Sequence, residues 1–157
     1  MSIVQGVVLL IVLLVLSGID IRQHRLPDVL TLPLVALGLT LSALHGGWIG
    51  FAMAVFAAAL GFLVFLAIAW LYRRARGHDG LGLGDAKLLA AAGAWLGPLW
   101  LAPVVFISAT TALCCVLLLR LAGRTINSET RVPFGPFLAC GLFSCWLVDS
   151  GGWAVLR

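Results

Sequence analysis

Long apolar runs separated by short polar links are the dominant pattern of this chain. A helix needs roughly 20 apolar residues to cross the hydrocarbon core of a membrane, and runs of about that length recur along the whole sequence. We therefore expect an all-α, polytopic membrane protein with a single membrane-embedded domain over residues 1–157. The six predicted transmembrane helices lie near residues 2–19, 29–45, 48–72, 85–97, 99–119 and 133–156.

Two of these segments need comment. The fourth is the shortest, and it ends at Gly97-Pro98, a pair that stops helices and predicts a tight hairpin into the fifth. The first resembles a secretory signal in its apolarity, but residues 1–5 carry no basic side chain, and Asp20 follows the run closely. A secretory signal begins with a basic region, so we predict a helix that is retained.

Composition excludes a soluble domain. The chain is 62% hydrophobic and only 10% charged, whereas about a quarter of the residues are charged in a typical soluble domain. The polar links are too short to bury a core of their own. The net charge is +4, but the sequence has no basic stripe with interleaved aromatic residues, so nucleic-acid binding is not expected.

The basic residues are distributed unevenly along the chain. Apart from Arg157, every Lys and Arg lies in or beside the links after the first, third and fifth predicted helices. Cytoplasmic loops of membrane proteins are enriched in Lys and Arg, so these three links are predicted to be cytoplasmic and both termini to lie outside.

Two acidic residues lie at ends of apolar segments. Asp20 closes the first segment, and Asp85 opens the fourth in the glycine-rich run Gly80–Lys87. An acidic residue is costly at such a position, and a functional role is the default interpretation. Both fall on the predicted cytoplasmic side. Two carboxylates brought together there suggest an aspartyl protease, because neighbouring carboxyl groups cannot both ionise and one retains its proton.

Each aspartate also has a simpler interpretation. Asp85 would cap the fourth helix while Gly80, Gly82 and Gly84 form a flexible turn, a role compatible with catalysis. Asp20 would be a boundary residue in water beside arginines that neutralise it. In the catalytic interpretation, the absence of side chains at Gly82 and Gly84 leaves space for an extended substrate backbone to approach Asp85.

Other chemistries find little support in the sequence. Asp28, directly after Pro27, is typical of an N-cap for the second helix. The three histidines are scattered over both sides, and no pair of cysteines forms a Cys-x-x-Cys motif, so no metal site is expected. Serine and threonine residues lack a well-placed His or Lys neighbour. The aspartyl interpretation therefore also follows by elimination, without a cofactor.

Three separated stretches together match a known pattern, namely Asp20–Pro33, Asp79–Gly97 and Val132–Ala139. In their motifs, order and spacing they resemble the bacterial type IV prepilin peptidases, leader peptidases of the Gly-x-Gly-Asp class of membrane aspartyl proteases. The resemblance spans almost the whole chain. It implies that Asp20 and Asp85 are the catalytic pair and that Gly82 and Gly84 belong to the motif.

The resemblance also implies a reaction and a location. The expected reaction is removal of a short basic leader from prepilin or pseudopilin precursors, at the cytoplasmic face of the bacterial inner membrane. Asp79, where the family usually has Glu, and Glu129 are candidates to meet the basic leader. Lys87 is a candidate to meet an acidic group of the mature pilin, with anchoring at the cytoplasmic face as its alternative.

Many relatives add an N-terminal extension with an N-methyltransferase activity, whereas this sequence begins at the peptidase region. Methylation is accordingly not expected from it. Two other functions remain as alternatives: a small proton-coupled transporter that uses Asp20 and Asp85 as a relay, and a non-catalytic subunit of a pilus or secretion machine. A relay favours acidic residues along a pore, whereas these two map to one face.

Overall fold

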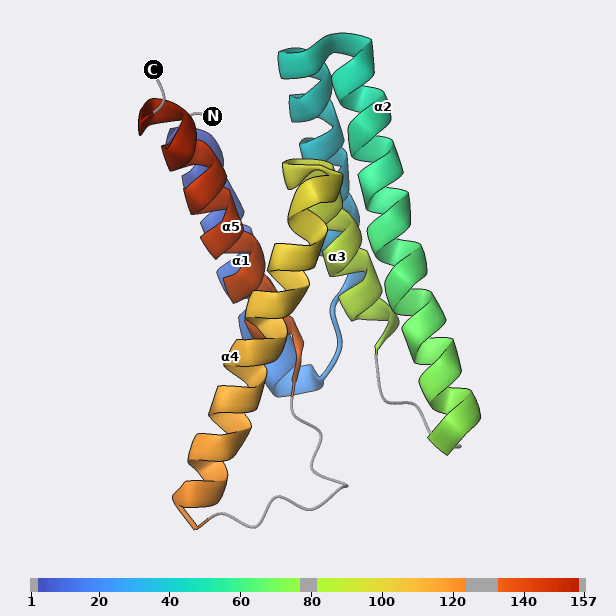
Figure 1. Cartoon of the computed structure of the whole chain (residues 1–157), viewed down its shortest axis with the longest axis vertical. Coiled ribbons are helices and arrows are strands. Elements are labelled where there is room, and N and C mark those ends of the chain that lie inside the picture. Colours follow the sequence, from blue (N-terminus) through green and yellow to red (C-terminus); the bar gives the residue numbers. More distant parts are fainter. Residues whose placement is uncertain (1–2, 77–81, 124–132, 156–157) are drawn as a thin grey trace.

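The structure is a computed structural model, and it describes residues 3–76, 82–123 and 133–155. All secondary structure in these ranges is helical. Five α-helices and a short 3₁₀ helix form the bundle shown in Figure 1. Their bounds are α1 Ile3–Gln23, α2 Asp28–Arg76, α3 Leu83–Leu96, η1 Pro98–Trp100, α4 Leu101–Leu121 and α5 Gly135–Val155.

Helix α2 accounts for two of the six predicted segments. It bends at Gly47, where φ is 58° and ψ is −147°, values that a residue with a side chain rarely adopts. Its two arms run back along each other from this bend (Figure 1). The predicted link after residue 45 is therefore confirmed as a turn between two helical arms, and each of the six predicted segments is helical in the structure.

The fourth segment ends where the sequence predicted. Gly97 terminates α3 with φ at 81°, and its backbone N–H donates to the Gly93 carbonyl. Pro98 then begins η1, which leads directly into α4. The tight hairpin predicted at Gly97-Pro98 is thus confirmed.

Three helical segments in the described part of the chain are long and apolar enough to cross a membrane: α1, α2 and the continuous stretch from η1 through α4. Much of their surface is apolar and exposed, as expected for helices that face lipid. Helix α3 is different, since its 14 residues extend about 21 Å, less than the roughly 30 Å of a bilayer core.

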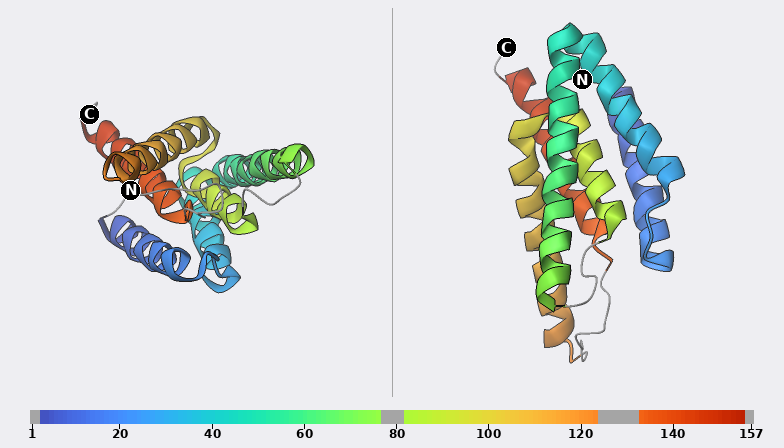
Figure 2. Two further views of the ribbon diagram at one scale, coloured as in Figure 1. Left: turned by 90° about the horizontal axis from the view of Figure 1, so that it is seen from below. Right: turned by 90° about the vertical axis from the view of Figure 1, so that its right-hand side faces the viewer.

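Helix α3 lies in the interior of the bundle. Figure 2 (left) shows it next to both arms of α2, with α4 and α5 on its other side. Nearly every side chain from Asp85 to Trp95 is buried. Helices in membranes approach closely where residues are small; here Gly93 packs against the backbone at Ala57, and the Trp95 indole N–H donates to the Leu34 carbonyl at 2.9 Å.

The bundle has two distinct ends (Figure 1). The start of α1, the Gly47 bend and the link from α3 to α4 lie at one end. The last turn of α1, both termini of α2, the first turn of α3 and the first turn of α5 lie toward the other. Helix α1 packs mainly against α5, so the end of α1 meets the beginning of α5. This second end carries the candidate site.

Candidate active site

Asp20 lies in the last turn of α1 and is buried, with 6% of its surface exposed. The helix continues to Gln23, and the His24 backbone N–H donates to the Asp20 carbonyl at 2.8 Å. One carboxylate oxygen of Asp20 accepts a hydrogen bond from the backbone N–H of Gly135, with 2.9 Å between nitrogen and oxygen. Asp20 is thus a buried residue held by the start of α5, which argues against a boundary residue in water.

Asp85 lies in the first turn of α3, outside the three candidate spans. The N-cap of α3 is Gly82, which has no side chain to make a capping hydrogen bond. Asp85 is the third residue of the helix. The Asp85 carboxylate interacts with the backbone N–H of Gly82, as an acidic residue at this position does in a capping box. The capping interpretation is therefore correct in substance, although Asp85 is not the N-cap itself.

The two aspartates are close enough to influence each other. Burial, as the main cause, and the nearby carboxylate of Asp20 together raise the pKa of Asp85 from its ordinary value of 3.8 to about 6. The Gly82 N–H acts in the opposite direction but does not offset these two causes. Two negative charges at short range repel each other, so one of two neighbouring carboxyl groups tends to retain its proton. The structure thus brings the two predicted site residues together.

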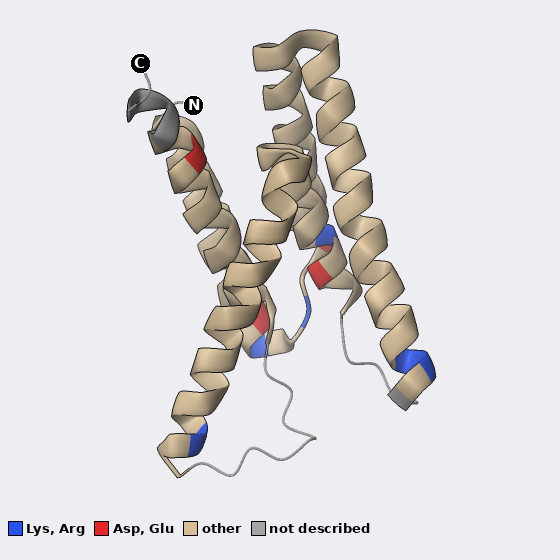
Figure 3. Ribbon diagram, viewed as in Figure 1, with Lys and Arg blue, Asp and Glu red and all other residues tan. Residues whose placement is uncertain are grey.

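Figure 3 shows the charges at this end of the bundle. The acidic positions of α1 and α3 lie at a similar level, and the basic residues of the helices gather toward the same end. Arg22 and Arg25 are exposed. The charge asymmetry predicted from the sequence therefore corresponds to one end of the molecule.

Gly84 has a neighbour that the sequence did not indicate. A Cβ atom at position 84 would lie 2.8 Å from the Cβ atom of Leu26, a contact too short for a real side chain. Leu26 belongs to the link between α1 and α2 and is buried at 8% exposure. The absence of a side chain at Gly84 is thus needed for the link to pack against α3. Gly82 is exposed, and a Cβ there would meet Asp85 Oδ2 at an ordinary 3.6 Å.

Lys87 forms an ion pair with Asp28, with 2.5 Å between Nζ and Oδ1. The pair joins the first turn of α3 to the first turn of α2. The Pro27 carbonyl accepts from the backbone N–H groups of Leu30 and Thr31, which places the start of α2 at Pro27-Asp28. The prediction that Asp28 is the N-cap was wrong by one position, because Asp28 is already helical and its side chain reaches Lys87.

Two further residues were predicted to take part in substrate recognition. Asp79 and Glu129, suggested to read the basic leader, lie outside the described residues. Within the described part of the chain, no group of three or more His, Cys, Asp or Glu side chains is arranged to hold a metal ion.

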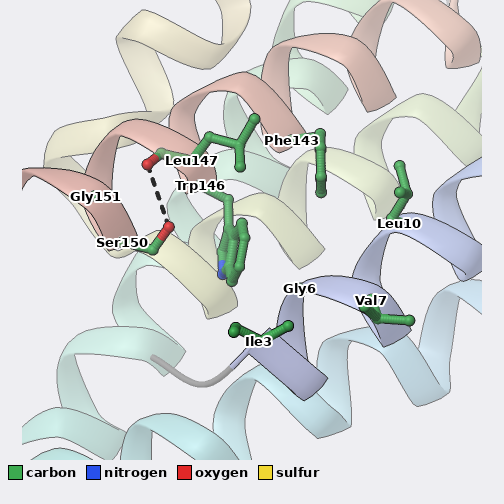
Figure 4. A pocket seen from close by; sticks show the side chains of 9 residues that line it. All are labelled: Ile3, Gly6, Val7, Leu10, Phe143, Trp146, Leu147, Ser150 and Gly151. Carbon is green, nitrogen blue, oxygen red and sulfur yellow. Dashed lines mark hydrogen bonds between the residues drawn. The ribbon is translucent and has the colours of Figure 1, made fainter.

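A pocket of about 440 Å³ lies between α1 and α5 at the opposite end of the bundle. Figure 4 shows its lining, where Trp146 and Phe143 of α5 face Ile3 and Gly6 of α1. Two lining side chains carry a polar group: the indole of Trp146 and the hydroxyl of Ser150, which donates to the Leu147 carbonyl. The lining holds no acidic or basic residue, so this pocket offers no acid–base chemistry.

Comparison with known proteins gives a family for the chain. Residues 7–117 match the type IV leader peptidase family. The chain belongs to this family. Its relatives include "Prepilin leader peptidase/N-methyltransferase" proteins of Burkholderia pseudomallei, 45% identical over 129 residues, and of Pseudomonas aeruginosa, 43% identical over 129 residues. A relative of the same name from Xanthomonas campestris is 40% identical over 135 residues.

These matches cover 82%, 81% and 85% of this chain, respectively, but only 41%, 43% and 46% of the relatives. The chain thus spans less than half the length of the leader peptidases that it matches. No solved structure matches it.

Gly135 and Leu26 are the site residues that the sequence interpretation missed. Gly135 was included only within the third matching stretch, and its contact with Asp20 depends on how α5 packs against α1. A signal was available, since Gly135 and Pro136 open the last apolar segment, and the first turn of a helix presents free N–H groups. Leu26 was included only within the first matching stretch, as an apolar residue in a charged link, and its contact with Gly84 was not predicted.

Proposed function

We propose that this chain is a membrane aspartic endopeptidase of the leader peptidase type, with Asp20 and Asp85 as its catalytic pair. The observation that carries the proposal is the meeting of two buried carboxyl groups from helices far apart in sequence, where Asp20 helps to raise the pKa of Asp85. Peptide hydrolysis by such a pair needs one ionised carboxylate and one protonated carboxyl group, and this arrangement favours that state.

The proposed substrates are prepilin or pseudopilin precursors, from which the enzyme removes a short basic leader. Family membership and the names of the relatives support this substrate class. Lys87 pairs with Asp28, so any contact of Lys87 with an acidic group of the mature pilin has to compete with this ion pair. Asp79 remains a candidate for contact with the leader on sequence grounds.

The proposed topology places the catalytic pair at the cytoplasmic face of the bacterial inner membrane. Six transmembrane segments, with the two arms of α2 counted separately and α3 enclosed by its neighbours, would put both termini outside. The support is the gathering of basic residues at the end of the bundle that holds Asp20 and Asp85 (Figure 3), since cytoplasmic loops carry an excess of Lys and Arg.

The deciding experiment is cleavage of a purified prepilin precursor by the purified protein in detergent. Asp20→Asn and Asp85→Asn should each lower kcat by at least about a thousandfold, because both carboxyl groups take part in proton transfer. Asp149→Asn is the control, since this acidic residue lies in the far half of α5 and accepts a hydrogen bond from Trp100. Substantial cleavage by either of the first two variants, folded and inserted, would remove that aspartate from the mechanism.

A further inference from the structure

The start of α5 presents to the candidate site a backbone N–H that has no partner within the helix. Gly135 is the first residue of α5, and the first N–H groups of a helix have no partner within the helix. Pro136 has no N–H, and the N–H of Phe137 donates to the Phe134 carbonyl. The N–H of Gly135 is directed at Asp20 Oδ2, at 2.9 Å, in a buried environment.

The same residue must lack a side chain for this contact to form. A Cβ atom at position 135 would lie 2.6 Å from Oδ2 of Asp20 and 3.0 Å from its Cγ. Any other residue would displace the carboxylate or the start of α5. Glycine thus allows the backbone of α5 to approach Asp20 closely.

Donors at a helix start favour a negative charge. A backbone N–H that donates to a carboxylate stabilises the ionised form, and the partial positive charge at the helix N-terminus acts in the same direction. Asp85 also has a backbone donor, the N–H of Gly82, but burial and the charge of Asp20 outweigh it. The two carboxyl groups therefore have unequal surroundings.

The other charged groups at this end do not reverse this difference. The described basic groups at this end are exposed: Arg22, His24 and Arg25 of α1 and its link, Arg73 and Arg74 at the end of α2, and Arg120 at the end of α4. Asp28 of α2 and Lys87 of α3 neutralise each other in an ion pair. The described part of α5 contributes no charged side chain near its start.

We propose that Gly135 is a positioning residue whose backbone N–H holds Asp20 as the carboxylate, so that Asp20 is the general base and Asp85 the general acid. This assignment rests on the proposed peptidase function. In the first step, Asp20 takes a proton from water as the water oxygen bonds to the scissile carbonyl carbon, while Asp85 donates its proton to the carbonyl oxygen.

The second step restores both groups. Asp20, now protonated, donates its proton to the leaving amine nitrogen as the carbon–nitrogen bond breaks. Asp85 takes back a proton from a hydroxyl group of the tetrahedral intermediate as the carbonyl re-forms. Atoms and charges balance over the cycle, and no further reactant is required.

Two variants of Gly135 test the role of its backbone N–H against the effect of an added side chain. Gly135→Ala and Gly135→Pro both add a Cβ atom, but only proline removes the N–H. Proline is well tolerated at the first position of a helix, and Phe134, which precedes it, is non-helical and so compatible with a following proline. Gly135→Ala controls for the added Cβ atom. Proline also places its Cδ atom where the N–H points at Asp20, so a difference between the two variants reports the loss of the hydrogen bond together with this added atom.

The measurement is kcat/KM for precursor cleavage as a function of pH. The acid limb of this profile reports the base, so in Gly135→Pro it should move to higher pH than in Gly135→Ala by about one to two pH units, the effect of losing one charge-assisted hydrogen bond. The alkaline limb, which reports the acid, should stay in place. Identical acid limbs in the two variants would overturn the proposal.

A second measurement does not depend on cleavage. Infrared difference spectra of the purified full-length protein at pH 5 detect the carbonyl stretch of a protonated carboxyl group. This band should disappear in Asp85→Asn and remain in Asp20→Asn. The opposite pattern would overturn the assignment even if both variants of Gly135 were inactive. The expected pattern in a protein that cleaves no precursor would show that Asp85 holds the proton, while contradicting the proposed function and with it the roles of base and acid.

Discussion

At the scale of single residues, the two carboxyl groups differ in what surrounds them. Asp20 receives a backbone N–H from the start of another helix, whereas Asp85 lies within the buried face of α3. Burial and the neighbouring Asp20 raise the pKa of Asp85 to about 6. Two residues of one type thus acquire different properties from their positions, which is how acid and base are distinguished in enzymes with paired carboxyl groups.

The raised pKa predicts how activity depends on pH. Asp85 must be protonated to donate, so kcat/KM should fall as the pH rises through about 6, where Asp85 loses its proton. The profile is measured with the free enzyme and subsaturating precursor between pH 4.5 and 8.5. A constant kcat/KM across this range would show that the protonation of Asp85 does not limit the reaction.

The same shift predicts how stability depends on pH. Since the folded state raises the pKa of Asp85 from 3.8 to about 6, it binds the proton more tightly than the unfolded state does. The resulting stabilisation is complete below pH 3.8 and is lost as the pH rises through about 6. Thermal unfolding in detergent should show this decline in the parent protein and a weaker decline in Asp85→Asn. An equal decline in both would contradict the shift.

Gly84 and Gly82 should respond differently to substitution. Gly84→Ala places a Cβ atom 2.8 Å from Leu26 and should destabilise the protein by about 1–3 kcal/mol through overpacking, with a loss of activity. Gly82→Ala is the matched control, because its Cβ atom meets no contact closer than 3.6 Å. Leu26→Ala should restore little of this loss, because alanine keeps the Cβ atom that the added methyl group would meet. Equal tolerance at positions 82 and 84 would show that the Leu26 contact is unimportant.

At the scale of elements, α3 is held in place by small residues and by one ion pair. Its buried face meets both arms of α2, and Lys87 joins its first turn to Asp28 at the start of α2. These contacts fix the first turn of α3, and with it Asp85, relative to the link that follows Asp20. The geometry of the candidate pair therefore depends on packing between helices as well as on the two aspartates.

The Lys87–Asp28 pair is expected to contribute little to stability. Its side chains are 28% and 57% exposed, and pairs of this kind contribute about 1 kcal/mol or less. Lys87→Gln and Asp28→Asn should therefore have similar small effects on unfolding and on cleavage. If Lys87 instead contacts an acidic group of the substrate, Lys87→Gln should raise KM for the native precursor several-fold while Asp28→Asn does not.

The fit of α3 against α2 should be sensitive at Gly93. Gly93→Ala introduces a Cβ atom against the backbone at Ala57, which cannot move as a side chain can. We expect a loss of about 1–3 kcal/mol in stability. Gly18→Ala in α1 is the control, because no atom lies within 4 Å of its added Cβ, and alanine favours helix. Lower unfolding temperatures for Gly18→Ala than for Gly93→Ala would contradict this account.

At the scale of the whole molecule, most of the described charged residues lie toward one end of the bundle. Basic residues, both aspartates of the candidate pair and the first turns of α2, α3 and α5 share this end (Figure 3). The exposed apolar sides of the long helices suit a lipid environment. The proposed hydrolysis consumes water, and exposed charged residues lie at the same end of the bundle as the candidate pair.

The proposed orientation can be measured with truncated reporter fusions. A reporter fused after Ser128 should be active in the cytoplasm, and one fused after Gly46 or at the C-terminus should be active outside, because basic links remain cytoplasmic. A cytoplasmic C-terminus would contradict six spans and would indicate that α3 does not act as a span.

The sequence by itself determined the helical segments, their approximate ends and the class of the protein. Apolar length and the positions of glycine and proline are local properties, so the bend at Gly47 and the stop at Gly97-Pro98 were readable in advance. The candidate pair was also readable, because an acidic residue at the end of an apolar run is costly enough to stand out without knowledge of its neighbours.

Only the tertiary structure decided what surrounds that pair. The N–H of Gly135 on Asp20, the contact of Leu26 with Gly84 and the pairing of Lys87 with Asp28 each join segments distant in sequence. A hydrogen bond or a close contact depends on positions within a few tenths of an ångström, which the relative placement of packed helices sets. The proposed assignment of the proton to Asp85 rests on the first of these contacts, and no pattern along the chain contains it.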